Sequence, residues 1–343
     1  MKLLDLFKKK KANKSTFPEN ELERYLMEAP SSSDAQKYFY QKLIWNQLIV
    51  LTPDYLEAEE GEQVVEENGK LKLVSFEGGQ IPVFTSLNRI FDQDIINEKK
   101  VSYISLKGQD LFSMTKGASF ILNPYSGYGK ELVPEEIEQL MNGTIYDQID
   151  ADEAERIQTE NFTKLYDLAC EKQDGLILLG GYRMESLDPA DQLKLEESVD
   201  YFKQCLALIE DHWPSMVLKA KALQRLGRHE EALSLLEKAF VSNEENHAIP
   251  MEAALEAIHL QDLEKALYYS AASMERKPND FALMGNHAMN LVLAERDNEA
   301  LALIEQALVL EPKDEVNENV KNLILGVIAG DRARPTMEET VGY

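Results

Sequence analysis

Histidines and cysteines are the residue types here that could do nucleophilic, acid–base or metal chemistry. The chain has five histidines and two cysteines, and all of them lie after residue 169. A catalytic triad joins a histidine to a serine or cysteine and an orienting acid, and the first 169 residues supply neither the histidine nor the cysteine. No spacing fits a zinc ligand set. We therefore expect no catalytic residue, no metal and no cofactor.

One glycine-containing turn invites a phosphate-binding interpretation, the run Gly127-Tyr128-Gly129-Lys130-Glu131. A P-loop needs Gly-x-x-x-x-Gly-Lys followed by Ser or Thr, whose hydroxyl holds Mg²⁺. Here Glu131 follows the lysine and would repel phosphate, and Pro124 stands where the first glycine should be. The pattern instead predicts a turn before a helix that begins at Pro134. This turn is still the best surface candidate of the first half, formed by Asn123, Tyr125, Tyr128 and Lys130.

The second half contains a 34-residue repeat, with frames that start at Trp213, His247 and Phe281. Small residues recur at the same frame positions, and a proline stands near the end of the last two frames. Two antiparallel helices approach closely only where small side chains lie at the crossing, and proline stops a helix between units. The period therefore predicts helix–turn–helix units. These residues are Ala220, Ala254, Ala288, Ala232, Ala266, Ala300, Ala239, Ser273, Ala307, Pro278 and Pro312.

This pattern resembles the tetratricopeptide repeat (TPR) family over roughly 179–314. The frame at 179–212 is degenerate, because Gly180, Gly181 and Pro189 would interrupt its first helix. A final helix near 316–328 is expected to cap the array. We therefore expect a helical connector or degenerate repeat at 146–178, a TPR-like solenoid with its cap helix at 179–330, and a flexible tail at 331–343.

The TPR resemblance implies a concave groove, lined by the first helix of each unit, that binds a protein or peptide. It would be basic at one end and rich in methionine and leucine toward the other, which suits adaptable packing. Alternatively, the next unit or the cap helix buries these side chains. Asn286 and Asn290 do not match the carboxylate clamp of some relatives, so a C-terminal carboxylate ligand is not expected. The groove residues are Val217, Lys221, Gln224, Arg225, Met251, Leu255, Ile258, His259, Met289, Val292 and Leu293.

Residues 16–145 have the pattern of an α+β domain, a short-stranded sheet with flanking helices. Helices are expected near 20–28, at 35–47 and from Pro134 to a point before Gly143, and an exposed hairpin loop at 57–70. If the runs at 80–84 and 120–122 are neighbouring strands, the candidate turn lies beside Thr85 and Ser86. The β-rich runs are Leu48–Leu51, Lys72–Ser75, Gln80–Phe84, Ser102–Leu106 and Phe120–Leu122.

Several separated motifs of this half, in this order, resemble the N-terminal domain of the SseB (enhanced serine sensitivity) family over about 16–145. The resemblance implies a cytoplasmic bacterial domain named for a serine-sensitivity phenotype, with no agreed reaction, so it transfers no catalytic residue. The motifs are Pro18–Glu23, Ile81–Ser86, Leu111–Ala118, Leu122–Pro124, Gly129–Glu131 and Pro134–Ile137.

Charge and hydropathy restrict the partners. The formal net charge is −25, which opposes a surface built for nucleic acid or anionic lipid. No apolar run is long enough to span a bilayer, and we interpret residues 1–15, with Lys8–Lys11, as a flexible basic tail without stable membrane association. We expect a cytoplasmic protein of undetermined oligomeric state.

Two kinds of function are consistent with these patterns. The first is a non-catalytic adaptor or regulator, in which the TPR groove binds a partner protein and the SseB-like domain a second target. The alternative is a sensor or enzyme of serine or sulfur amino-acid metabolism, or an immunity-type binder of a toxin or effector.

Overall fold

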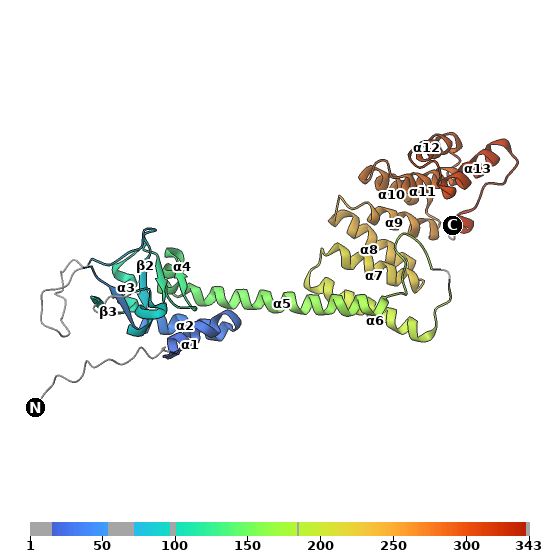
Figure 1. The fold of residues 1–343 in the computed structure, drawn as a ribbon. Helices are drawn as coiled ribbons and strands as arrows, with labels where there is room; N and C mark the ends of the chain where they lie inside the picture. Colours follow the sequence, from blue (N-terminus) through green and yellow to red (C-terminus); the bar gives the residue numbers. More distant parts are fainter. Residues whose placement is uncertain (1–15, 54–71, 97–100, 184, 341–343) are drawn as a thin grey trace, which may run out of the picture. The chain divides into compact units, whose positions relative to one another are not determined.

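The computed structural model describes residues 16–53, 72–96, 101–183 and 185–340 (Figure 1). The tail predicted at 1–15 and the loop predicted at 57–70 lie outside the described residues. The chain divides into two compact units, Met1–Arg156 and Ile157–Tyr343. Each unit has its own hydrophobic core.

A five-stranded mixed sheet organises the first unit, in the order β3-β1-β2-β4-β5. Only β2 and β4 run parallel; the other neighbouring strands are antiparallel. Four strands confirm predicted runs, whereas Lys72–Ser75 forms no strand and the last strand falls where a turn was predicted. The strands are β1 (Gln47–Leu51), β2 (Ile81–Phe84), β3 (Tyr103–Lys107), β4 (Phe120–Leu122) and β5 (Lys130–Leu132).

Helices enclose the apolar side of this sheet. Asn20 caps the first helix, and a capping serine, Ser32, begins the second, whose Phe39 and Leu43 are buried against the sheet. Gly108 lies so close to the second helix that a Cβ would stand 1.9 Å from the Leu43 carbonyl oxygen, so only glycine fits there. The helices are α1 (Glu21–Glu28), α2 (Ser33–Trp45), α3 (Gly108–Met114) and α4 (Pro134–Asn142), with 3₁₀ turns at Ala29–Ser31 and Leu87–Asp94.

A 30-residue helix, α5 (Thr144–Gln173), begins in the first unit and ends in the second. Within the second unit its last turns pack on α6 (Pro189–Leu208), where the Ser198 hydroxyl donates to the Ala169 carbonyl oxygen at 2.9 Å. This helix overlaps the stretch 146–178, which was predicted to be a helical connector or a degenerate repeat.

The rest of the second unit is a series of helix pairs, which Figure 1 shows stacked in chain order. The second helices of the pairs begin at residues 229, 263 and 297, so the 34-residue period is retained in space. The alanines at the repeated small positions are buried at the helix crossings. The helices are α7 (Trp213–Arg225), α8 (His229–Ser242), α9 (Ala248–His259), α10 (Leu263–Arg276), α11 (Phe281–Leu293), α12 (Asp297–Leu310), the cap α13 (Glu315–Ala329) and the short α14 (Met337–Thr340).

Candidate functional site

The predicted groove residues all lie on α7, α9 and α11, the first helices of the three pairs. We call the surface that they form the first-helix face. Five of them are buried: Val217, Lys221, Gln224, Ile258 and Val292. The others, Arg225, Met251, Leu255, His259, Met289 and Leu293, are partly exposed. The face is therefore covered in places, and the covering segments come from this chain.

Residues 178–183, which we call the strap, lie against the first-helix face. In the chain they follow α5 and precede α6. The Gly180 N–H donates to the Glu252 carboxylate at 2.5 Å, and the Lys221 ammonium donates to the Gly181 carbonyl oxygen at 2.9 Å. Arg225 donates to the carbonyl oxygen of Arg183 at 3.3 Å. The Arg225 guanidinium also donates at 2.5 Å to the carbonyl oxygen of Glu185, just beyond the strap. These hydrogen bonds all involve the backbone of the covering segment.

One strap side chain anchors the segment. The Tyr182 hydroxyl donates to the Leu255 carbonyl oxygen at 2.8 Å, and its ring lies 5.4 Å from the His259 ring. Burial is the main cause that raises the pKa of Tyr182, so the phenol stays protonated and acts as a donor.

Beneath the strap lies a polar network that the sequence analysis missed. Lys221 and Glu252, each at most 2% exposed, form an ion pair of 2.8 Å between α7 and α9. One turn further along, Glu256 accepts hydrogen bonds from Gln224 and from His229, the latter at 3.0 Å. Burial raises the pKa of Glu252 despite the opposing effect of Lys221. Two glutamates four residues apart on an otherwise apolar helix were the signal in the sequence.

Histidines at this network stack rather than coordinate. The centroids of the stacked His229 and His259 rings lie 3.6 Å apart. Burial lowers the pKa of His259, and the nearby His229 ring lowers it further. In the described ranges, no cluster of three or more His, Cys, Asp or Glu side chains could hold a metal ion.

The C-terminal residues cover the other part of this face. Met337 packs with Ile258 and Leu293, and Arg334 donates to the Val292 carbonyl oxygen and to both Asp297 oxygens, at 2.6 and 2.9 Å. Residues 331–340 belong to the segment that we predicted to be a flexible tail, and these contacts tie them to α9, α11 and α12.

In the first unit, β2 and β4 are neighbours, as the surface prediction required. Their carboxyl ends meet, so the Asn123 amide bonds the Thr85 backbone and hydroxyl at 3.0 Å each. Asn123 is buried there, Tyr125 packs near Phe84, the Tyr128 ring stacks on Phe17 and Lys130 pairs with Glu136 at 2.9 Å. These four residues therefore gather at one end of the sheet but engage separate partners.

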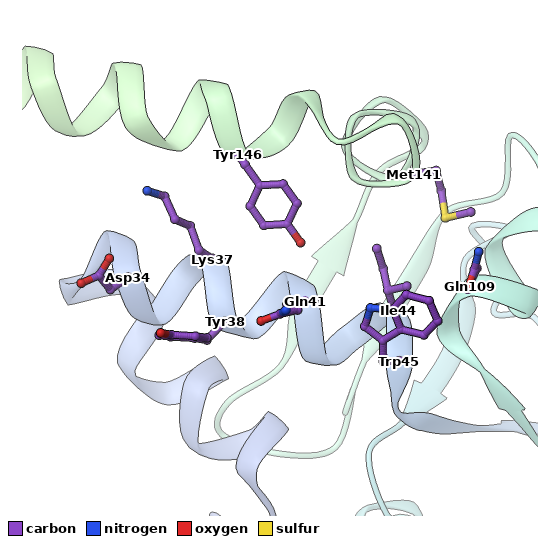
Figure 2. Close-up of a pocket in the computed structure, with 9 residues that line it drawn as sticks. All are labelled: Asp34, Lys37, Tyr38, Gln41, Ile44, Trp45, Gln109, Met141 and Tyr146. Atoms are coloured by element: carbon purple, nitrogen blue, oxygen red, sulfur yellow. The ribbon is translucent and has the colours of Figure 1, made fainter.

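A different surface of this unit is hollowed. A pocket of about 590 Å³ lies between α2, the start of α3, and the residues around the junction of α4 and α5. Figure 2 shows the side chains that line it. Trp45 and Tyr38 are 58% and 50% exposed. The sequence analysis had not singled out this pocket. Its lining residues are Asp34, Lys37, Tyr38, Gln41, Ile44, Trp45, Gln109, Met141 and Tyr146.

No helix in the part of the chain that the structure describes combines the length and apolar character needed to cross a bilayer.

Comparisons with known proteins give one family match and several similar solved structures. Residues 22–139 match the family described as SseB protein N-terminal domain. No curated protein matches the chain. Among solved structures, YrrB, described as a TPR protein with an unusual peptide-binding site, is 18% identical with a TM-score of 0.37, covering 41% of this chain and 73% of its own. MamA is 10% identical with a TM-score of 0.38, covering 42% of this chain and 87% of its own.

The TPR-like assignment is carried by the chain's own helices, with their 34-residue period and buried alanines at the repeated small positions. Residues 22–139 thus match the SseB N-terminal domain family, and the helix pairs that follow them in the chain form a TPR-like array.

Proposed function

We propose that this protein is a non-catalytic interaction adaptor, whose repeat array holds a segment of a partner protein on the first-helix face. One observation carries the proposal: that face already holds a segment of this chain, the strap, mainly through the strap's backbone. The strap turns at Gly180 rather than running extended. Hydrogen bonds to backbone atoms are available to any peptide that can adopt this turn, so the surface suits a partner segment as well.

Side chains beside the strap add affinity without strict specificity. Met251, Leu255 and Met289 are partly exposed on α9 and α11. Methionine adapts its shape to varied apolar partners, and apolar surface on a repeat array is typical of an interaction site. The repeat half therefore supplies the primary binding surface.

The SseB domain supplies a second contact, at the pocket of Figure 2. Its exposed Trp45 and Tyr38 belong to the residue types that dominate binding energy at interfaces. A partner side chain seated between these rings would join two targets on one chain.

Capture from an extract of the native cell tests the adaptor function. The tagged full chain is compared with a double variant, Met251→Ala with Met289→Ala, and with a matched control, Val309→Ala, whose side chain is 80% exposed on α12. We expect the double variant to retain about one-tenth of the partner or less, because the proposal places both side chains at the centre of the binding surface, where two truncations that together cost about 1.4 kcal/mol lower the affinity tenfold. Equal capture by all three chains contradicts the proposal.

A thermal-shift series addresses the alternative of a metabolite sensor. A ligand that binds the folded state raises the melting temperature. If the protein is an adaptor and not a sensor, serine, cysteine and related amino acids at millimolar concentration should leave the melting temperature of the full chain unchanged. A saturable rise with one of them would favour the sensor over the adaptor.

A further inference from the structure

We propose that the strap is an internal ligand of the first-helix face, and that a partner segment binds by displacing it. This inference rests on the proposed function and adds its regulation and the chemistry of the partner. It follows from how the strap is held, what it leaves behind and how its ends are fixed.

The strap contributes little apolar burial of its own. Leu178 and Leu179 are 47% and 61% exposed, and the next two residues are glycines. Apolar burial is what makes a segment part of a core, so the strap is attached to the array rather than built into it. Tyr182 is its one anchoring side chain, through the Leu255 carbonyl oxygen.

The helices before and after the strap, α5 and α6, are held by contacts that do not involve it. Asp188 caps α6 by accepting a hydrogen bond from the Asp191 N–H at 2.8 Å. The Ser198 hydroxyl joins α6 to α5 at Ala169, and Lys172 of α5 pairs with Glu197 of α6. Opening the strap therefore breaks its own contacts but leaves the α5–α6 pair intact.

The surface beneath the strap also keeps its structure. Lys221 and Glu252 remain paired across α7 and α9 when the strap leaves, and Glu256 keeps Gln224 and His229. Their remaining hydrogen-bonding capacity returns to water or to a new backbone. A buried pair of this kind that stays satisfied preserves a preformed binding surface.

The strap's contacts define the partner's chemistry. A matching segment turns where the strap turns, offers an N–H to Glu252 and carbonyl oxygens to Lys221 and Arg225, and places an aromatic ring shortly after the turn. Gly180 has a φ of 76°, which favours glycine, and a Cβ there would lie 3.4 Å from the Met251 methyl carbon. We infer that the partner class is a segment with a glycine turn followed by an aromatic residue.

Tethering gives the strap an advantage over a free segment. A short flexible tether holds a ligand at an effective concentration on the order of millimolar. A free peptide with the same contacts therefore binds the intact chain poorly, because only the fraction of molecules with an open strap is competent. Weakening the strap should raise the apparent affinity for a free peptide.

The probe is a fluorescent peptide with the sequence of residues 176–187, titrated against the full chain by anisotropy. We expect binding to Tyr182→Ala to be at least tenfold tighter than to the wild type. The matched control Tyr268→Ala removes an exposed tyrosine of α10 and should bind the peptide as poorly as the wild type. A peptide in which alanine replaces the tyrosine should bind none of the three.

Equal binding to the wild type and Tyr182→Ala, or binding to neither, overturns the inference. If Tyr182→Ala does not fold by circular dichroism, hydrogen exchange on the wild type decides. The Gly180 amide should then exchange by local opening, at least tenfold faster than the core amides of α7; exchange at their rate contradicts displacement.

The two proposals fail separately. Partner capture that depends on Met251 and Met289 but is unchanged by Tyr182→Ala preserves the adaptor and overturns the internal ligand. Peptide binding to Tyr182→Ala without capture of any partner supports the internal ligand and removes the adaptor.

Discussion

One residue in each repeat turn adopts the left-handed backbone conformation. Gly227, Gln261 and Glu295 have φ values of 75°, 58° and 60°, and they lie 34 residues apart. Glycine adopts this conformation without steric cost, whereas a residue with a Cβ is strained there. The first repeat therefore has a relaxed turn, and the next two carry strain.

This difference predicts opposite effects of exchanging the residues. Gly227→Ala should lower the free energy of unfolding by about 1 kcal/mol, since its Cβ would meet nothing within 4 Å and only the backbone is strained. Glu295→Gly should raise it by about 0.5 kcal/mol. Urea unfolding followed by circular dichroism measures both.

A control separates backbone strain from charge at this turn. Glu295→Asn also removes the carboxylate but introduces a residue that tolerates the left-handed region. It should be at least as stable as the wild type. A Gly227→Ala chain as stable as the wild type would show that the turn relaxes and that the strain is absent.

At the scale of elements, the C-terminal segment is a clasp on the array. Arg334 donates to both oxygens of Asp297 at the start of α12. This hydrogen bonding is the main cause that lowers the pKa of Asp297. Arg334→Ala should reduce the free energy of unfolding by about 1 kcal/mol at neutral pH. Arg332→Ala, at an exposed neighbouring position, is the matched control and should have little effect.

The clasp also has a defined pH dependence. Because the pKa of Asp297 is lower in the folded chain, its contribution is complete above the ordinary aspartate pKa, near 3.9, and is lost as the pH falls through the folded value. The stability difference between the wild type and Arg334→Ala should therefore shrink as the pH is lowered from 7 toward 3. A difference that stays constant over this range excludes the ion pair as its source.

Elements with a strong periodic pattern were the predictable part of the fold. Small residues every 34 positions indicated the helix pairs from α7 to α12, and short β-branched runs indicated β1 to β4. The strand at 130–132 was missed because it has the sequence Lys-Glu-Leu, without a β-branched or aromatic residue, and directly follows a glycine turn. Lys72–Ser75 was predicted as a strand but forms none in the described part of the chain, where the Val74 N–H donates to the Leu51 carbonyl oxygen.

The covering of the first-helix face could not be predicted in this way. The strap is held by backbone atoms, and these leave no trace in residue types or periodicity. Lys221 illustrates the consequence: its position on the groove was inferred from the repeat frame, but its burial depends on Glu252 and the Gly181 carbonyl oxygen. Similarly, the helix that carries Tyr38 and Trp45 was predicted from its pattern, but the pocket that these side chains line was not.

At the scale of the whole molecule, two compact units carry two separate candidate surfaces on one chain. Each surface rests on its own core, since the pocket belongs to the first unit and the first-helix face to the second. An adaptor needs only this covalent linkage, with no energetic coupling between the sites. The two binding activities should therefore be separable by mutation.

Separability gives the last prediction. Trp45→Ala removes a side chain that is 58% exposed, so the fold should lose little stability. Capture of the second target should fall about tenfold. Capture of the partner on the repeat array should be unchanged. Leu87→Ala, at a 43% exposed position outside the pocket, is the control. Co-capture of the two targets by the wild type, and of only one by Trp45→Ala, is the expected signature; loss of both targets in Trp45→Ala would mean that the two surfaces bind a single partner.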